Sequence, residues 1–256
     1  MKPEFSISIP IPSLLIFIFF AITLSSCVPS YNLANSGIDP IVFSKPVYRD
    51  TATVNDYIGG KFTHSYDSVY FNPNESNSFG QVYWFRTRSE KDYCYSYGGF
   101  GYLGNYNVAA IESLKGKKNY YGVGVSGDLC LNIDLDFADL RVLGVKGALF
   151  YEDGDYQHFK KQVNKDSLAI SVTDKVGINL ASYTGFDIKL RKSSFGLYFT
   201  TGITTGFNSR FMMFNYSAIA NYQTDRMTFF VQKSSTSSGL FYYGSDYSVG
   251  FNYRIK

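Results

Sequence analysis

The chain has 256 residues, of which 18% are aromatic and 18% are charged, and its formal net charge is +3. An average domain carries about 25% charged residues, so this sequence is poor in charge and rich in aromatic rings. A weak net charge without a lysine or arginine stripe excludes a typical nucleic-acid binder. A hydrophobic content of 45% excludes a disordered chain, and three cysteines exclude a disulfide-dense mini-protein.

The N-terminus has the pattern of a secretory signal peptide. Lys2 supplies the positive start, an apolar run follows from Ile7 to Thr23, and small residues come next. The uninterrupted core, Leu14 to Thr23, is shorter than the roughly 20 apolar residues that a membrane helix needs. The sequence therefore predicts that residues 1–26 are removed on export.

The last residues of this leader, Leu24-Ser25-Ser26-Cys27, resemble the bacterial lipobox. The resemblance implies that Cys27 is lipid-modified and becomes the first residue of the mature chain. Val28, Pro29 and Ser30 include neither the Asp of an inner-membrane retention signal nor an acidic export run. We therefore expect an acyl anchor on the periplasmic side of the outer membrane; the alternative is an ordinary signal peptide with a chance cysteine at the cut.

The mature chain divides into an irregular tether, residues 27–56, and a region of strict alternation, residues 57–256. In the last segment, for example, Tyr247, Val249, Phe251 and Tyr253 alternate with small or polar residues, which is typical of a strand with one apolar face. About ten strands (eight to twelve) are predicted, at 57–66, 79–88, 93–106, 119–133, 138–152, 178–190, 195–207, 214–223, 226–233 and 246–255.

Short and long connections alternate along these strands. The short ones are predicted at 89–92, 134–137, 191–194 and 224–225, and the long ones at 67–78, 107–118, 153–177, 208–213 and 234–245. Outer-membrane barrels have short periplasmic turns, long outer loops and an even number of strands. An even count also returns the C-terminus to the side on which we expect the Cys27 anchor.

Aromatic residues fall near both ends of several predicted strands, on one face of each. They are Phe195 and Phe207, Phe214 and Tyr222, and Tyr247 and Tyr253. Rings at two membrane interfaces would give this spacing. Over residues 57–256 the chain thus resembles small outer-membrane β-barrel proteins of Gram-negative bacteria, which implies an all-β, antiparallel up-and-down barrel. We expect its aromatic rings to lie on outward faces and in interface girdles, and the alternative fold is a soluble periplasmic β-sandwich lipoprotein.

Cys94 and Cys130 lie on the small or polar faces of two consecutive predicted strands, at similar distances from the loop between them. Exported proteins permit disulfides. We therefore expect a cross-strand disulfide in the lumen near the periplasmic end, with two free thiols as the alternative.

Four charged residues are predicted to face the lumen near the same end: Asp128, Asp187, Lys189 and Arg254. We interpret them as a polar network that fills space, because a barrel of this size is packed with side chains or holds one small ligand.

Lysines gather in the predicted outer loops, where they could contact phosphate groups of surface lipids. They are Lys115, Lys117 and Lys118, with Lys160, Lys161 and Lys165 in the next loop.

The two histidines, His64 and His158, are not joined by any metal-ligand spacing, and no cofactor motif is credible. His64-Ser65-Tyr66-Asp67 is a conceivable fragment of a catalytic site near the outer rim. The sequence thus favours a non-enzymatic outer-membrane barrel lipoprotein with a structural or binding role, held by the bilayer and without nucleic acid. An outer-membrane enzyme that modifies lipid or peptide through His64 is the remaining alternative.

Overall fold

The computed structural model describes residues 30–31, 34, 52–66, 75–166, 170–208, 212–238 and 241–255. The predicted signal peptide, Cys27 and Asp67 lie outside these residues. Within the described ranges, no helix is long and apolar enough to cross a membrane.

Ten long strands dominate the chain. Their bounds are β2 (Thr53–Tyr66), β3 (Ser76–Ser89), β4 (Tyr93–Val108), β5 (Gly116–Asp134), β6 (Ala138–Gly154), β8 (Val176–Lys189), β9 (Ser193–Gly206), β10 (Met212–Thr224), β11 (Met227–Ser238) and β12 (Phe241–Arg254). The shorter elements are β1 (Ser30–Tyr31), a 3-10 turn η1 (Glu112–Leu114), helix α2 (Asp155–Lys165) and β7 (Ile170–Ser171).

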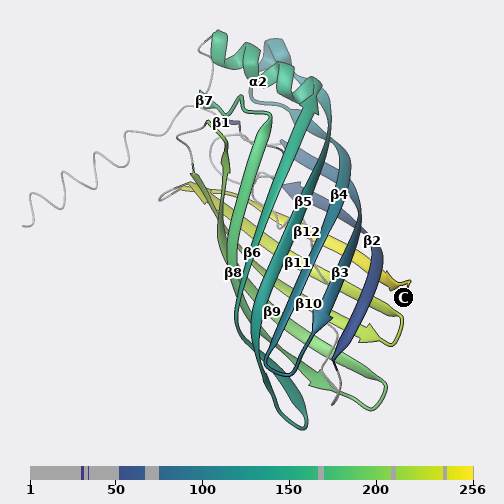
Figure 1. Ribbon diagram of the computed structural model, residues 1–256. Helices are drawn as coiled ribbons and strands as arrows, with labels where there is room; N and C mark the ends of the chain where they lie inside the picture. Colours follow the sequence, from purple (N-terminus) through teal and green to yellow (C-terminus); the bar gives the residue numbers. More distant parts are fainter. Residues whose placement is uncertain are drawn as a thin grey trace, which may run out of the picture.

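The long strands form one closed antiparallel barrel in which each strand pairs with its neighbours along the chain. β12 pairs with β2 and completes the ring (Figure 1). The prediction of an all-β up-and-down barrel of about ten strands is confirmed, and each predicted strand corresponds to one observed strand.

The two ends of the barrel differ. At one end, which we call the turn end, strands are joined by two or three residues, and here β2 begins at Thr53 and β12 ends at Arg254. The opposite end, the loop end, carries α2 and the longer connections, together with the two-residue connection between β11 and β12 (Figure 1).

One predicted long loop, 234–245, is wrong. β11 and β12 stay paired as far as Ser238 and Phe241, across a bulge at Thr236 and Ser237. The Ser/Thr run of β11 has no apolar alternation, but Ser234 and Thr236 face the lumen, where polar side chains are accommodated.

Alternation along each strand sends apolar side chains outward. On β5, Val123, Val125 and Leu129 are 61%, 60% and 54% exposed, whereas Tyr120 on the opposite face is 2% exposed. All six residues of the predicted aromatic girdles also point outward and are exposed.

The expectation that the rings lie mainly on the outside is only half correct, because a second aromatic set fills the lumen. Its barrel members are Tyr57, Phe79, Tyr83, Phe85, Phe100, Tyr102, Tyr120 and Phe150, all buried. Glycines on neighbouring strands make room for such rings: a Cβ at Gly122 would lie 2.2 Å from the Tyr102 ring.

Three described residues that precede the barrel, Ser30, Tyr31 and Ala34, lie at its loop end. β1 pairs in parallel with β7, next to α2 at the loop end. Tyr31 is 1% exposed, and Ala34 is buried. Moreover, β2 begins at Thr53, so the last four residues assigned to the tether belong to the barrel. We expected the chain after Cys27 to remain at the turn end; Ser30, Tyr31 and Ala34 lie at the loop end instead.

Candidate functional site

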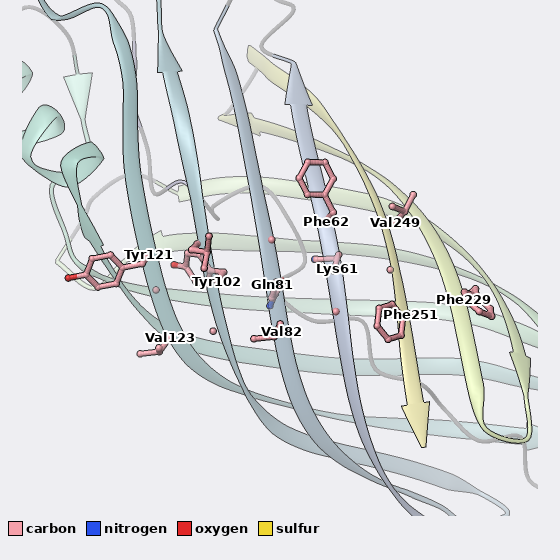
Figure 2. A pocket seen from close by; sticks show the side chains of 16 residues that line it. Lys61, Phe62, Gln81, Val82, Tyr102, Tyr121, Val123, Phe229, Val249 and Phe251 are labelled. Atoms are coloured by element: carbon pink, nitrogen blue, oxygen red, sulfur yellow. The ribbon is translucent and has the colours of Figure 1, made fainter. Parts of the chain in front are cut away.

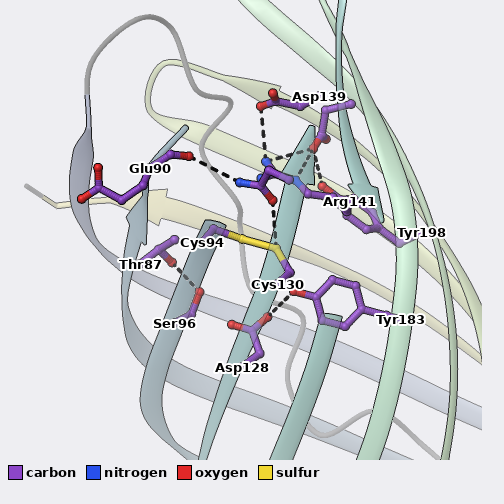
Figure 3. The surroundings of a disulfide bond; sticks show 12 residues. Thr87, Glu90, Cys94, Ser96, Asp128, Cys130, Asp139, Arg141, Tyr183 and Tyr198 are labelled. Carbon is purple, nitrogen blue, oxygen red and sulfur yellow. Dashed lines mark hydrogen bonds and ion pairs between the residues drawn. A yellow bond between two sulfur atoms is a disulfide. The ribbon is translucent and has the colours of Figure 1, made fainter. Parts of the chain in front are cut away.

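Many buried polar and charged side chains face the lumen. We describe them as two clusters, one near the turn end and one near the loop end. The turn-end cluster contains the disulfide. Cys94 and Cys130 are direct partners in the β4–β5 register, with Cα atoms 5.2 Å apart, and both are buried (Figure 3). This separation lies within the range that a disulfide requires.

Arg141 is the central charge of the turn-end cluster. Its side chain is fully buried, and its guanidinium lies 3.3 Å from the Asp187 carboxylate and 3.7 Å from that of Asp139. The Tyr198 hydroxyl donates to the same Asp187 oxygen. Lys189 pairs with Asp139, at 3.7 Å, and with Asp134.

The four charges predicted for this region lie in different immediate surroundings, and the Tyr183 and Tyr198 rings, 6.4 Å apart between centroids, connect two of them. Asp187 and Lys189 belong to the Arg141 cluster, whereas Asp128 accepts a hydrogen bond of 2.9 Å from the Tyr183 hydroxyl (Figure 3). Arg254 lies at the end of β12, opposite Tyr57 of β2.

Sequence reasoning missed Arg141 and Asp139 because β6 is irregular. The register of β6 against β8 shifts between Arg141 and Gly144. This bulge reverses the alternation, so that Asp139 and Arg141 face the lumen together with Gly144, although strict alternation would separate them.

The loop-end cluster is built on two buried carboxylates. Glu75, 2% exposed, accepts hydrogen bonds from the Tyr31 hydroxyl at 3.0 Å and from the Tyr106 hydroxyl at 2.8 Å. The backbone N–H groups of Ala109 and Ala110 donate to it as well, each at 3.0 Å. Glu75 thus joins the N-terminal segment to the β4–β5 loop.

Glu152, fully buried, is the second carboxylate. The backbone N–H of Ala34 donates to both of its oxygens, at 3.0 and 3.1 Å, and the Tyr102 hydroxyl donates at 3.3 Å. The ammonium group of Lys160, on α2, lies 3.4 Å away. Burial lowers the pKa of Lys160, and the Glu152 carboxylate opposes that shift.

Aromatic contacts pack α2 and the N-terminal segment over the barrel. Phe159 meets the Tyr31 ring edge-on at 4.8 Å between centroids, and Tyr156 stacks on Tyr106 at 4.7 Å. Both α2 rings are buried. Every carboxylate oxygen of this cluster has a partner, so the arrangement is suited to holding chain segments in place.

The predicted loop lysines separate into different environments. Lys115 pairs with Glu112 at 3.5 Å, Lys117 is exposed, and the Lys118 ammonium lies 6.0 Å from the centre of the Phe159 ring. Lys161 and Lys165 are exposed on α2. Lys160 is fully buried against Glu152 and is not a solvated loop lysine, because it lies on the face of α2 that covers the lumen.

His64 points out of the barrel near the loop end, and its Nδ1 lies 2.7 Å from the Ser78 hydroxyl on the neighbouring strand. Ser65, the next residue, points to the opposite face because strand side chains alternate. The proposed His64-Ser65 fragment is therefore divided between two faces.

In the part of the chain that the structure describes, no group of three His, Cys, Asp or Glu residues could hold a metal ion.

The outer wall carries a shallow apolar groove of about 930 Å³ that is lined by residues of β11, β12, β2, β3, β4 and β5. Gly60, Gly80 and Gly101 line it together with Phe62, Val82 and Phe251, whose side chains Figure 2 shows. A Cβ at Gly80 would meet no atom within 4 Å, so the groove is not required by packing inside the protein.

No family model and no curated protein matches this chain. Among solved structures, the β domain of the Bordetella autotransporter BrkA is 9% identical with a TM-score of 0.45, covering 78% of this chain and 98% of that one. An outer-membrane channel from Pseudomonas putida F1 is 9% identical with a TM-score of 0.40, covering 83% and 97%. The outer-membrane protease OmpT from Escherichia coli is 7% identical with a TM-score of 0.31, covering 83% and 99%. Similarity at this level transfers no activity to this chain.

Proposed function

We propose that this chain is an integral outer-membrane β-barrel lipoprotein with a closed lumen and a structural or binding role. The observation that carries the proposal is the distribution of side chains on a closed barrel: apolar outside, polar and aromatic inside. A water-soluble protein of this size rarely exposes a continuous apolar patch larger than a few hundred Å².

The height of the apolar belt supports a membrane environment. On β5 the outward apolar positions extend from Tyr121 to Ile133, and all but Gly127 carry large side chains. Twelve residue steps of about 3.3 Å at a tilt of about 40° cover roughly 30 Å along the barrel axis. This matches an apolar band of about 25 Å with an aromatic girdle at each edge.

The soluble sandwich alternative has less support. A sandwich would leave edge strands on both of its sheets and would bury its apolar residues between the sheets. Here β12 pairs with β2, and the apolar residues of β5, β9 and β12 point away from the lumen. In the outer membrane, the longer connections of the loop end would face outward and the turn end the periplasm.

The occupied lumen favours a structural or binding role over diffusion through a channel. α2, Tyr31 and Ala34 cover the loop end, while the Arg141 cluster and the disulfide lie near the turn end. The enzymatic alternative through His64 has less support, because Ser78, the hydroxyl partner described for His64, lies with it on the outer face of the wall, whereas Ser65 faces the lumen.

The test is extraction combined with heat-modifiability on a gel. The exported protein is expected to resist salt and carbonate washes, to require detergent, and to migrate differently with and without boiling. Release by salt alone, without a heat-dependent shift, would contradict the proposal.

A pair of substitutions on one strand sharpens this test. Val125→Arg introduces a charge in the middle of the belt and is expected to cost about 2–4 kcal/mol of folding free energy in lipid. Asn119→Arg, on the same face of β5 but near the loop end, is the matched control and should fold normally. Equal behaviour of the two variants would argue for water around both positions.

A further inference from the structure

A row of polar side chains, which we call the polar row, crosses six adjacent strands on the outer face of the barrel. Its members are direct register partners from β11 through β12, β2, β3 and β4 to β5, and they are Lys233, Tyr247, His64, Ser78, Asn105 and Asn119. The next outward positions toward the turn end are register partners as well, and they are Val231, Val249, Phe62, Gly80, Leu103 and Tyr121. The outer wall thus changes from apolar and aromatic to polar side chains between one outward position and the next.

The apolar groove adjoins the polar row on its turn-end side. Phe62, Gly80 and Val249, each one outward position from the polar row, line the groove (Figure 2). A Cβ at Gly60 or Gly101 would make only ordinary contacts, at 3.6 and 3.7 Å, and one at Gly80 would meet no atom within 4 Å. The packing of the protein does not require this hollow. In a bilayer it is filled by hydrocarbon, because a void forfeits dispersion contacts.

Lys233 supplies a positive charge to the polar row. It is exposed on the outer face between Ala218 of β10 and Tyr247 of β12, and its ammonium lies 5.7 Å from the centre of the Tyr247 ring. Among the described residues, no carboxylate forms an ion pair with it. Six residue steps of about 3.3 Å at a tilt of about 40° put it roughly 15 Å from Met227 along the barrel axis, within an apolar band of about 25 Å. A lysine on the lipid face is costly there unless an anion neutralises it.

The surroundings of Lys233 fit a phosphate group. A lysine ammonium binds phosphate as a point charge, and its flexible stem can extend along the wall toward the membrane interface. Tyr247 and His64, on the next two strands, bring a hydroxyl and an imidazole to the same face. The Ser78 hydroxyl lies 2.7 Å from Nδ1 of His64. No member of the polar row is a carboxylate, so the row complements an anion.

We propose that the polar row and the groove form one binding site for an outer-leaflet lipid with an anionic phosphate headgroup. The phosphate lies against Lys233, Tyr247 and His64, and one acyl chain occupies the groove on their turn-end side. This inference rests on the proposed function, in which the loop end, and with it the polar row, faces the outer leaflet.

Trp84, the single tryptophan, reports on this site. It lies four residues from Gly80 along β3, roughly 13 Å toward the turn end and on the same outer face. It lines a second hollow that shares Val82, Gly101 and Phe251 with the groove. An acyl chain that enters the groove at the polar row and runs toward the bilayer centre therefore brings its middle carbons close to Trp84.

The experiment reconstitutes the exported, full-length protein in phosphatidylcholine vesicles that contain a rising fraction of one brominated lipid. The bromines are placed in mid-chain either on phosphatidic acid, which carries a phosphate monoester, or on phosphatidylcholine with the same acyl chains. Quenching of Trp84 fluorescence gives the relative association of each lipid with the site. One lysine near a membrane surface favours an anionic lipid about fivefold, so brominated phosphatidic acid should associate about fivefold more strongly than brominated phosphatidylcholine.

Two substitutions test the headgroup contact and the groove separately. Lys233→Gln removes the positive charge, and Gly80→Leu fills the groove; each should remove the preference for phosphatidic acid. The matched controls are Lys117→Gln, an exposed lysine closer to the loop end on β5, and Gly147→Leu, on the outer face of β6 away from the groove. Both controls should retain the preference. Heat-modifiability verifies that each variant has folded.

Equal quenching by the two brominated lipids in the wild type, or a preference that survives Lys233→Gln or Gly80→Leu, overturns the inference and leaves the barrel proposal standing. If neither brominated lipid nor iodide quenches Trp84, a second copy of the chain covers the groove, and the inference is overturned as well. If iodide quenches Trp84 and the brominated lipids do not, the proposed function itself fails. The failures are therefore distinguishable.

Discussion

The substitution Arg141→Met tests how much the buried ion pairs of the turn-end cluster contribute to stability. Its guanidinium is fully buried and 3.3 Å from the Asp187 carboxylate, whereas Asp139 also has the Lys189 ammonium at 3.7 Å. Removing one partner of a buried ion pair leaves an uncompensated charge and costs about 3–5 kcal/mol. We expect the free energy of unfolding to fall by that amount, mainly through Asp187.

The assay is urea unfolding of the protein refolded in lipid vesicles, followed by the fluorescence of the single tryptophan, Trp84. Arg141→Met combined with Asp187→Asn removes both charges and should recover a large part of the loss. Arg88→Met, which removes an arginine that is 44% exposed and paired with Glu90, is the control and should stay close to the wild-type stability. A loss below about 1 kcal/mol for Arg141→Met, the usual value of an exposed pair, would refute a buried ionic cluster.

Three further predictions concern the membrane, the disulfide and the anchor. Trp84 faces outward and is 42% exposed, so lipids brominated in mid-chain should quench its fluorescence strongly. An aqueous quencher such as iodide should have little effect. Strong quenching by iodide and none by the brominated lipids would show that Trp84 does not lie in the bilayer. Cys94→Ser with Cys130→Ser should lower stability by about 2–4 kcal/mol in the same urea assay, and a reductant should have no effect on that variant while destabilising the wild type. Cys27→Ser should abolish incorporation of labelled palmitate and retain the heat-modifiable barrel; labelling that persists in Cys27→Ser would contradict the lipobox resemblance.

The barrel was predictable because each strand has one face toward lipid and one toward the packed lumen. Apolar residues therefore alternate with small or polar residues along nearly every strand. Residues 119–133, with Val123, Val125 and Leu129 on one face, needed no tertiary information to be identified as a strand. The Cys94–Cys130 pairing followed from the same regularity, since equal distances from a hairpin loop bring two residues opposite each other.

The errors arise where a local irregularity or a long-range contact determines the position. The bulge after Arg141 cannot be identified from the sequence pattern, but it reverses the face of β6 from which side chains enter the lumen. The central charge of the turn-end cluster was therefore missed. Helix α2 lies in a predicted loop, and its buried face is defined only by the barrel rings beneath it. The position of Tyr31 depends on Glu75, 44 residues later, and no pattern within residues 27–56 contains that information.

The two ends of the lumen are closed by different chemistry, and the difference bears on function. At the turn end, Arg141 and the disulfide join strands that are already neighbours or near neighbours in the wall, so they stiffen the barrel itself. At the loop end, Glu75 and Glu152 bind segments that are not part of the wall: the Ala34 backbone, Tyr31 and Lys160 of α2. A carboxylate that holds a separate segment through several hydrogen bonds can release it without breaking the pairing of the barrel strands. Glu152→Gln, which removes the charge that binds Lys160 but retains an acceptor, should therefore loosen α2 and the N-terminal segment while the heat-modifiable barrel persists. Faster amide exchange confined to α2 and residues 30–34 would support this division, and a barrel that unfolds as a whole would show that both ends belong to one cooperative unit.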